Sequence, residues 1–249
     1  MIDEGAVDAI AGLTRQGDLI HTLEISGRTF AREPLTEIRE RTESEPVTLV
    51  VSTLTGLRDY LIANRDELNL SEYMLHVVDA GQVDLISAKQ GEYLQRLRWV
   101  TAKNIDRFAA LPNFSFGKYY GLETFNIALQ ALFEARGDRE RVLQLLGTVS
   151  DDADVTREDD GTTQKVTARA GIVLKDRIPV PNPVLLSPFR TFPDLPQQPI
   201  SPFILRVKKS DDGPAAALFE ADGGAWKNVA IGMVAEWLKE NVPGLTVLA

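Results

Sequence analysis

Carboxylates are the side chains with the most evident capacity for chemistry, and they are densest between residues 151 and 160. In that stretch they are Asp151, Asp152, Asp154, Glu158, Asp159 and Asp160. Carboxylate oxygens are the ligands that Ca²⁺ and Mg²⁺ prefer, but the spacing does not follow the EF-hand pattern. In the alternating β-ribbon that we predict over 151–171, only every second side chain points to the same side. We interpret these acids as solvated charges that discourage strand pairing, with a bound cation as the alternative.

A second carboxylate motif precedes the last helix that the sequence predicts. In FEADGGAW, residues 219–226, Glu220 and Asp222 come before Gly223, Gly224 and Trp226. Glycines at a helix N-terminus can bind an anion, but two carboxylates beside them would repel it. We interpret Asp222 as a helix cap and the glycines as a tight strand-to-helix turn. A carboxylate site formed by Glu220 and Asp222 is the alternative.

Histidine and cysteine, the other residues of most catalytic and metal sites, are scarce. Histidine occurs only as His21 and His76, both in predicted strands, and cysteine does not occur. The sequence contains none of the HExxH, GxSxG, Walker or GxGxxG motifs. We therefore assign no catalytic residue, no metal ligand and no cofactor, and we expect a non-enzymatic protein. A metal-dependent enzyme that uses Glu220, Asp222 or the acids of 151–160 is an alternative.

The best local basic patch lies in QRLRWVTAKNIDR, residues 95–107. It combines Arg96, Arg98 and Lys103 with Trp99. Basic and aromatic side chains in alternation are typical of single-strand nucleic-acid binding. The whole chain, however, has 27 Lys and Arg against 36 Asp and Glu, a formal charge of −9 that opposes attraction to phosphates. Nucleic-acid binding is therefore an alternative function. The aromatic cluster FSFGKYYG at 114–121 is interpreted as a packed loop.

Composition and patterning predict an α+β fold with mostly antiparallel strands backed by helices. The 249 residues form either a single large domain or two closely joined halves, about 1–121 and 122–249. Thr53 or Thr55 begins a helix after a strand, and Asp138 is placed to cap another helix. Predicted helices cover 3–16, 122–135, 138–149 and 225–241. Predicted strands and hairpins cover 18–30, 46–52, 73–79 with 82–88, 93–100, 151–171, and FILRVKK with AALFEADGG.

The last predicted helix carries its large apolar side chains on one face. That face consists of Trp226, Val229, Ala230, Met233, Trp237 and Leu238. We expect the helix to dock through its tryptophans.

Proline dominates the segment between 178 and 202, which contains eight of the 13 prolines. Proline lacks a backbone donor, so we expect this segment to be extended and irregular. Phe189, Phe192 and Phe203 would be costly to leave in water, so the segment should pack on a surface of its own chain or of a partner. Together with Arg190 these three residues form a candidate interface.

The acidic N-terminus and the lack of any apolar run of about 20 residues predict no membrane segment. Zero cysteines fit a reducing compartment. We therefore expect a cytoplasmic protein that does not contact a membrane.

A family resemblance covers the second half of the chain, from about residue 122 to residue 249. It is carried by QKVTARAG (164–171), PNPVLLSPFRTFPDLPQQPISPFILRV (181–207) and ALFEADGGAWKNVAIGMVAEWL (217–238). These segments resemble the YfdQ-like family of phage and prophage proteins. The resemblance implies a phage or prophage origin and production in the bacterial cytoplasm. It implies no catalytic residues, and within it the stretches 190–192 and 220–224 stand out.

These observations favour a function in assembly. We expect a phage- or prophage-encoded protein that acts through homo-oligomeric self-assembly, structural or shell-like, or by binding a phage or host protein. The alternatives are an accessory nucleic-acid-binding factor of phage recombination or anti-defence, and a metal-dependent enzyme.

Overall fold

The computed structural model of the chain consists of two compact units, Met1–Glu45 and Pro46–Ala249. Apart from residue 5, the predicted helix over 3–16 lies outside the described part of the chain, as do all the acidic side chains of the 151–160 run. The residues that the structure describes are 5, 22–25, 28–31, 36–37, 47–89, 95–105, 114–149, 155–157, 164–170, 173–211 and 213–249.

The first unit contains a three-stranded antiparallel sheet. Strand β1 (Thr22–Ile25) pairs with β2 (Arg28–Ala31), which in turn pairs with β3 (Thr36–Glu37). Ile25 lies opposite Arg28, so the chain reverses between these residues. Within the predicted segment 18–30, the described residues therefore form two paired antiparallel strands and not one.

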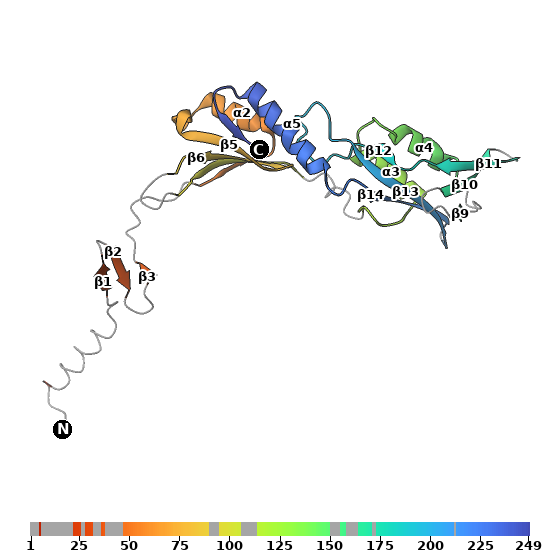
Figure 1. Ribbon diagram of the computed structural model, residues 1–249, viewed down its shortest axis with the longest axis horizontal. Helices are drawn as coiled ribbons and strands as arrows, with labels where there is room; N and C mark the ends of the chain where they lie inside the picture. Colours follow the sequence, from red (N-terminus) through yellow and green to blue (C-terminus); the bar gives the residue numbers. More distant parts are fainter. Residues whose placement is uncertain are drawn as a thin grey trace. The chain divides into compact units, whose positions relative to one another are not determined.

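A five-stranded sheet forms one part of the second unit. Its order is β15-β5-β6-β7-β4, and its antiparallel centre is the predicted hairpin, here β5 (Tyr73–Asp79) and β6 (Gln82–Ser87), followed by β7 (Arg98–Lys103). The edge strands β4 (Leu49–Val51) and β15 (Thr246–Leu248) run parallel to their neighbours. Figure 1 shows helices α2 (Leu54–Ala63) and α5 (Trp226–Asn241) on the same face of this sheet.

Alternation along these strands places one set of side chains under the two helices. Leu75, Val83, Leu85 and Val100 are fully buried there, together with Leu54 and Leu57 of α2. The start of α2 agrees with its predicted cap, because the Gly56 N–H donates to Thr53 Oγ1 at 3.0 Å. This first core also takes up α5 and β15 from the C-terminal end of the chain.

A four-stranded antiparallel sheet forms the other part of the second unit. Its order is β12 (Val184–Leu186), β13 (Ser201–Ser210), β14 (Gly213–Glu220) and β8 (Tyr120–Gly121). Helices α3 (Leu122–Leu132) and α4 (Arg139–Gly147) confirm the two predicted helices and share a second core with this sheet. Strands β9 (Val155–Arg157), β10 (Gln164–Ala170) and β11 (Val173–Val180) confirm the predicted β-ribbon. The fold is α+β with mostly antiparallel strands, as predicted.

Asp138 does not use its carboxylate as a helix cap, contrary to the prediction. It occupies the position before α4, but its Oδ2 accepts from the Leu185 N–H at 2.8 Å, while its own N–H donates to Leu185 O at 2.8 Å. Gly137 allows this close pairing. Its φ is +62°, and a Cβ there would lie 2.3 Å from Leu185 O. The contact fixes the chain before α4 against β12.

Helix α5 packs mainly through small and aliphatic residues, and of its two tryptophans Trp237 packs, partly buried, against the same core. Its buried side chains are Ala230, Val234, Ala235 and Leu238, whereas Val229 is 52% exposed. Trp226 and Trp237 are half-buried. The alanines let the helix approach the sheet closely, which moves the tryptophans to the border of the contact. Among the described residues, no helix has the length and apolar character needed to cross a membrane.

Residues 187–200 connect the two cores of the second unit. Strand β12 before them and Phe203 after them belong to the core of the four-stranded sheet, whereas Phe192 and Leu195 belong to the core of the five-stranded sheet. We call residues 187–200 the linker. The Asp194 carboxylate accepts from the backbone N–H groups of Leu54 and Thr55 at 3.1 and 3.0 Å. The linker therefore satisfies orphan donors at the start of α2.

We expect Asp194→Ala to destabilise the second unit by about 1–2 kcal/mol, because it removes the carboxylate that accepts from the first turn of α2. Urea unfolding followed by circular dichroism measures this change. Asp59→Ala is the matched control, because Asp59 lies exposed on the same helix and pairs with its neighbour Arg58. Equal stability of the two variants would contradict a capping role for Asp194.

Candidate functional site

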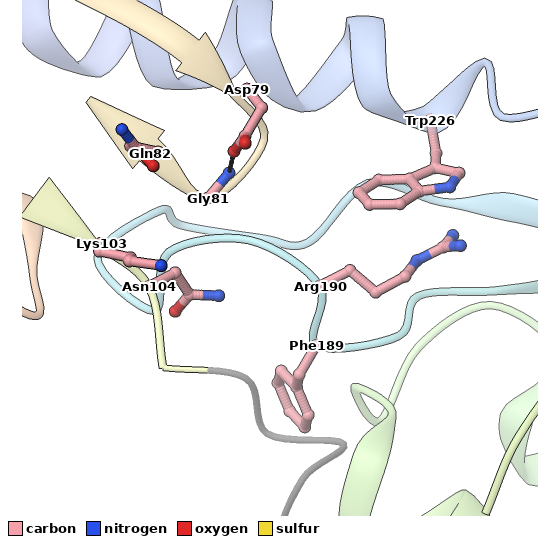
Figure 2. A pocket seen from close by; sticks show the side chains of 8 residues that line it. All are labelled: Asp79, Gly81, Gln82, Lys103, Asn104, Phe189, Arg190 and Trp226. Carbon is pink, nitrogen blue, oxygen red and sulfur yellow. Dashed lines mark hydrogen bonds between the residues drawn. The ribbon is translucent and has the colours of Figure 1, made fainter. Parts of the chain in front are cut away.

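A pocket of about 320 Å³ brings together three segments that the sequence had singled out separately. We call it the junction pocket. Its described lining residues, which Figure 2 shows as sticks, are Asp79, Gly81, Gln82, Lys103, Asn104, Phe189, Arg190 and Trp226. Lys103 comes from the basic patch, Phe189 and Arg190 from the proline-rich segment, and Trp226 from the FEADGGAW motif. All of them belong to the second unit.

One wall of the junction pocket is the end of the five-stranded sheet. The turn between β5 and β6 is fixed by the Gly81 N–H, which donates to Asp79 Oδ1 at 2.7 Å. The Asn104 N–H donates to Gly81 O at 2.8 Å and ties the chain after β7 to that turn. Gln82 pairs with Asp79 on one side and with Lys103 on the other. These polar side chains therefore form a row across three neighbouring strands.

The opposite wall is organised by Arg190. Its Nη1 pairs with Glu220 Oε1, its Nη2 donates to Ser201 Oγ at 2.7 Å, and its guanidinium carbon lies 4.0 Å from the centre of the Trp226 ring. The side chain is only 8% exposed, and this burial lowers the pKa of Arg190, opposed by the nearby Glu220 and Asp222. Arginine remains charged in proteins, so burial must be offset by these contacts.

Asp222 fixes the start of α5, as predicted for the turn. Its Oδ1 accepts from the Gly224 N–H at 3.0 Å and its Oδ2 from the Trp226 N–H at 3.2 Å. Burial raises the pKa of Asp222, but these two bonds, a hydrogen bond from Ser201 and the Arg190 charge outweigh it and lower the pKa below its usual value. Gly223 and Gly224 have φ values of +60° and +84°, which explains the glycine pair in this turn.

The linker turn that carries Arg190 is held by buried polar contacts. Gln198, 3% exposed, accepts through Oε1 from the N–H groups of Arg190 and Thr191, both at 3.0 Å. The Thr191 hydroxyl donates to Ala80 O in the turn between β5 and β6. The two walls of the junction pocket are thus joined directly.

The candidate interface residues of the proline-rich segment contact their own chain. Phe192 and Phe203 are both fully buried, Phe192 in the core of the five-stranded sheet and Phe203 in that of the four-stranded sheet. Phe189 is half-buried in the junction pocket, beside Arg190. The sequence predicts that these rings are buried, and the surface that buries Phe192 and Phe203 belongs to the same chain. Phe192 and Phe203 therefore leave no side-chain surface for a partner.

The basic patch is dispersed rather than gathered into one cationic surface. Arg98 Nε pairs with the buried Asp84 carboxylate at 2.9 Å, and Arg96 Nη1 donates to Ser87 O at 3.0 Å. The Trp99 ring packs edge-on against Tyr73 at 6.1 Å between centroids. Lys103 lies apart from them in the junction pocket. The cluster at 114–121 packs as expected, with Phe114 buried and stacked on Tyr120.

No group of three or more His, Asp or Glu able to hold a metal ion occurs within the described parts of the chain. Glu220 and Asp222 are both engaged by Arg190 or by backbone donors, so they do not form a free carboxylate pair. Of the two histidines, His76 is exposed on β5, and His21 lies outside the described residues.

The sequence patterns do not identify several residues of the junction pocket. Asp79, Gln82 and Asn104 line it, and Gln198 and Ser201 hold Arg190 in its wall. Asp79 and Gln82 stand on either side of the predicted hairpin turn, where a polar residue is ordinary. Gln198 lies among prolines and had no pattern of its own. Only their long-range contacts identify them.

We expect Asp222→Asn to destabilise the protein by about 1 kcal/mol at neutral pH, because the amide keeps only one acceptor oxygen. A lowered folded-state pKa means that the ionised form stabilises the fold. This stabilisation is complete above the ordinary pKa of 3.8 and is lost as the pH falls through the lower value in the folded protein. Urea unfolding at a series of pH values should show the variant and the wild type converging only in acid. Exposed Asp211→Asn is the control, and a difference that persists in strong acid would contradict this account.

We expect Arg190→Lys to destabilise the protein by about 2 kcal/mol, although the charge is kept. Lysine cannot donate to Glu220 and Ser201 in the fixed fork of a guanidinium while lying flat on Trp226. The melting temperature and the tryptophan fluorescence, to which Trp226 contributes together with Trp99 and Trp237, should both change. Arg141→Lys, exposed on α4, is the matched control, and equal stability of the two variants would show that the fork is not needed.

Comparison with known proteins provides no relative for this chain. No protein-family model matches it. No curated protein matches it, and no solved structure does. The functional conclusion therefore depends on the geometry of the described residues.

Proposed function

We propose that this protein acts through contacts with other protein chains, and in particular through self-association along the β4 edge of the five-stranded sheet. The observation that carries the proposal is the apolar character of this edge. Val50, in the middle of β4, is 64% exposed, Leu49 is 46% exposed, and Val47 just before the strand is 95% exposed.

Edge strands are usually protected, because their free N–H and C=O groups invite pairing with another chain. Charged side chains, proline within the strand, a bulge or a very short strand are the usual protection. Strand β4 is short, with only Leu49, Val50 and Val51, but it contains neither a charge nor a proline. It pairs in parallel with β7 on one side and ends the sheet on the other. Within the described part of the chain no strand pairs with this uncharged edge, which supports pairing with a partner strand.

A second copy of the chain is the partner that fits this edge best. Two β4 strands can pair antiparallel about a two-fold axis through Val50, so that Val50 meets its own equivalent and Leu49 of each copy meets Val51 of the other. Valine and leucine favour such cross-strand contacts. The pair would extend two five-stranded sheets into one continuous sheet.

A partner bound at the β4 edge would also contact the face of the sheet opposite α2 and α5. The register places Leu248, His76, Asp84, Thr101 and Val50 in one row on that face. Asp84, 1% exposed, is satisfied by Arg98 Nε at 2.9 Å and Thr101 Oγ1 at 2.9 Å. Because its polar centre is already bonded, a partner would bury the apolar ends of the row without leaving a charge unpaired.

A phage or prophage origin is part of the proposal. The resemblance of residues 181–207 and 217–238 to the YfdQ-like proteins supports it, and the lack of cysteine fits a reducing compartment such as the cytoplasm. Production in the bacterial cytoplasm follows from that origin. Self-association would then serve a structural or shell-like role, or present a surface to a phage or host protein.

Light scattering coupled to size exclusion tests the proposal on the full chain of 27.5 kDa. We expect a defined oligomer of two or more copies, and Val50→Lys should shift it to the monomer, because paired strands would place like charges opposite each other. Ile62→Lys is the matched control, since Ile62 is 72% exposed on the outer side of α2. A wild-type monomer at high concentration, or an oligomer that Val50→Lys leaves unchanged, would exclude association through β4.

A further inference from the structure

The polar side chains of the junction pocket retain hydrogen-bonding capacity that the fold does not use. Lys103 Nζ and the Asn104 side-chain amide form no hydrogen bond or ion pair with other described residues. Gln82 Nε2 donates to Asp84 at 3.1 Å, which leaves its Oε1 available. Asp79 uses Oδ1 for the Gly81 N–H, which leaves Oδ2 available. The pocket thus offers donors and acceptors together.

The pairing of the strands places a carboxylate at one end of a row of three side chains and an ammonium group at the other end. Asp79 lies beside Gln82, and Gln82 lies beside Lys103, across β5, β6 and β7. Neighbouring strands are about 4.8 Å apart, so the backbones of Asp79 and Lys103 are separated by about 10 Å. Both residues line the junction pocket, so their side chains can contact the two ends of one small molecule inside it. One end of such a molecule would meet an ammonium group and the other a carboxylate.

Aromatic side chains supply an apolar region next to this polar row. Figure 2 shows the Trp226 ring between α5 and Arg190, with Phe189 on the neighbouring part of the linker. The guanidinium beneath Trp226 fixes the ring in place at 4.0 Å. A pocket of about 320 Å³ has room for about ten water molecules at ~30 Å³ each, which suits a small metabolite and not a polymer.

The charge balance argues against a phosphate as the ligand. Asp79 lines the pocket, Glu220 and Asp222 lie behind Arg190, and the chain carries a formal charge of −9. Of the two cations, Arg190 already pairs with Glu220. Lys103 and Asp79 remain, and their charges cancel. A ligand with one positive and one negative group matches this balance and is not repelled by the protein as a whole.

We propose that the junction pocket binds a free α-amino acid with an apolar side chain. Lys103 Nζ and the Asn104 amide bind the α-carboxylate. Asp79 Oδ2 and Gln82 Oε1 accept from the α-ammonium group. The side chain of the ligand packs against Trp226 and Phe189. This activity is separate from self-association, because it uses the end of β7 and not the β4 edge.

Isothermal titration of the full-length protein with L-leucine and with L-phenylalanine tests the proposal. We expect saturable binding, and a rise in the melting temperature at saturating ligand by mass action. N-acetyl-L-leucine lacks the ammonium group and L-leucine methyl ester lacks the carboxylate. Each should bind at least about ten-fold more weakly than L-leucine, since each leaves one charged group of the pocket unpaired.

Two variants assign the two ends of the ligand. Lys103→Met should weaken L-leucine binding about ten-fold and abolish the preference for L-leucine over its methyl ester. Asp79→Asn should weaken it similarly and abolish the preference over N-acetyl-L-leucine, and its amide oxygen still accepts from Gly81. Lys239→Met on α5 and Asp59→Asn on α2 are matched controls that should bind as the wild type does. Unchanged melting temperatures without ligand show that the variants are folded.

Three results would overturn the proposal. One is the lack of saturable binding of L-leucine and L-phenylalanine at millimolar concentrations. The second is equal affinity for L-leucine and N-acetyl-L-leucine, which would show a simple anion site. The third is equal affinity for L-leucine and its methyl ester, which would show a simple cation site. None of these results depends on the oligomeric state of the protein.

Discussion

The linker of residues 187–200 is the constraint on which the second unit depends, because it must bury Phe192 and Leu195 in the core of the five-stranded sheet without forming regular structure, between two strands that belong to the other core. Its backbone groups need partners that a helix or sheet would otherwise supply. Gln198 supplies an acceptor for two consecutive N–H groups, and the Thr191 hydroxyl reaches Ala80 O. Asp194 in turn completes the first turn of α2. The linker is therefore organised by side-chain hydrogen bonds, and these bonds fix where it lies relative to both sheets.

Arg190 carries an unfavourable free energy of burial, and its contacts also position Trp226. Its side chain is almost completely buried, and its Nε has no hydrogen-bond partner among the described residues, which is unfavourable by about 1–3 kcal/mol. Glu220, Ser201 and the Trp226 ring offset this cost through the ion pair, the hydrogen bond and the cation–π contact. The same contacts hold Trp226 in the wall of the junction pocket. The geometry of the pocket is thus a consequence of how the linker is anchored.

Local signals in the sequence were sufficient for most elements and insufficient for their assembly. The hairpin of β5 and β6, the Thr53 cap and the bounds of α5 follow from patterns within a few residues. The orientation of α5 does not, because the small side chains of Ala230 and Ala235 decide how closely the helix packs. Hydrophobicity likewise predicts that Phe192 and Phe203 are buried but not which chain buries them. The pocket residues become neighbours only through long-range contacts, which no local pattern encodes.

Strand β7 connects the two functional surfaces that we propose, and its position explains how they can remain independent. It pairs with β6 along one side and with β4 along the other, while its last residue, Lys103, lines the junction pocket. Central strands resist displacement because their hydrogen bonds are satisfied on both sides. An occupant of the pocket needs only the side chains at the end of β7, and a second copy needs only the free edge of β4. Neither requires β7 to move, so the sheet can support both contacts without coupling them.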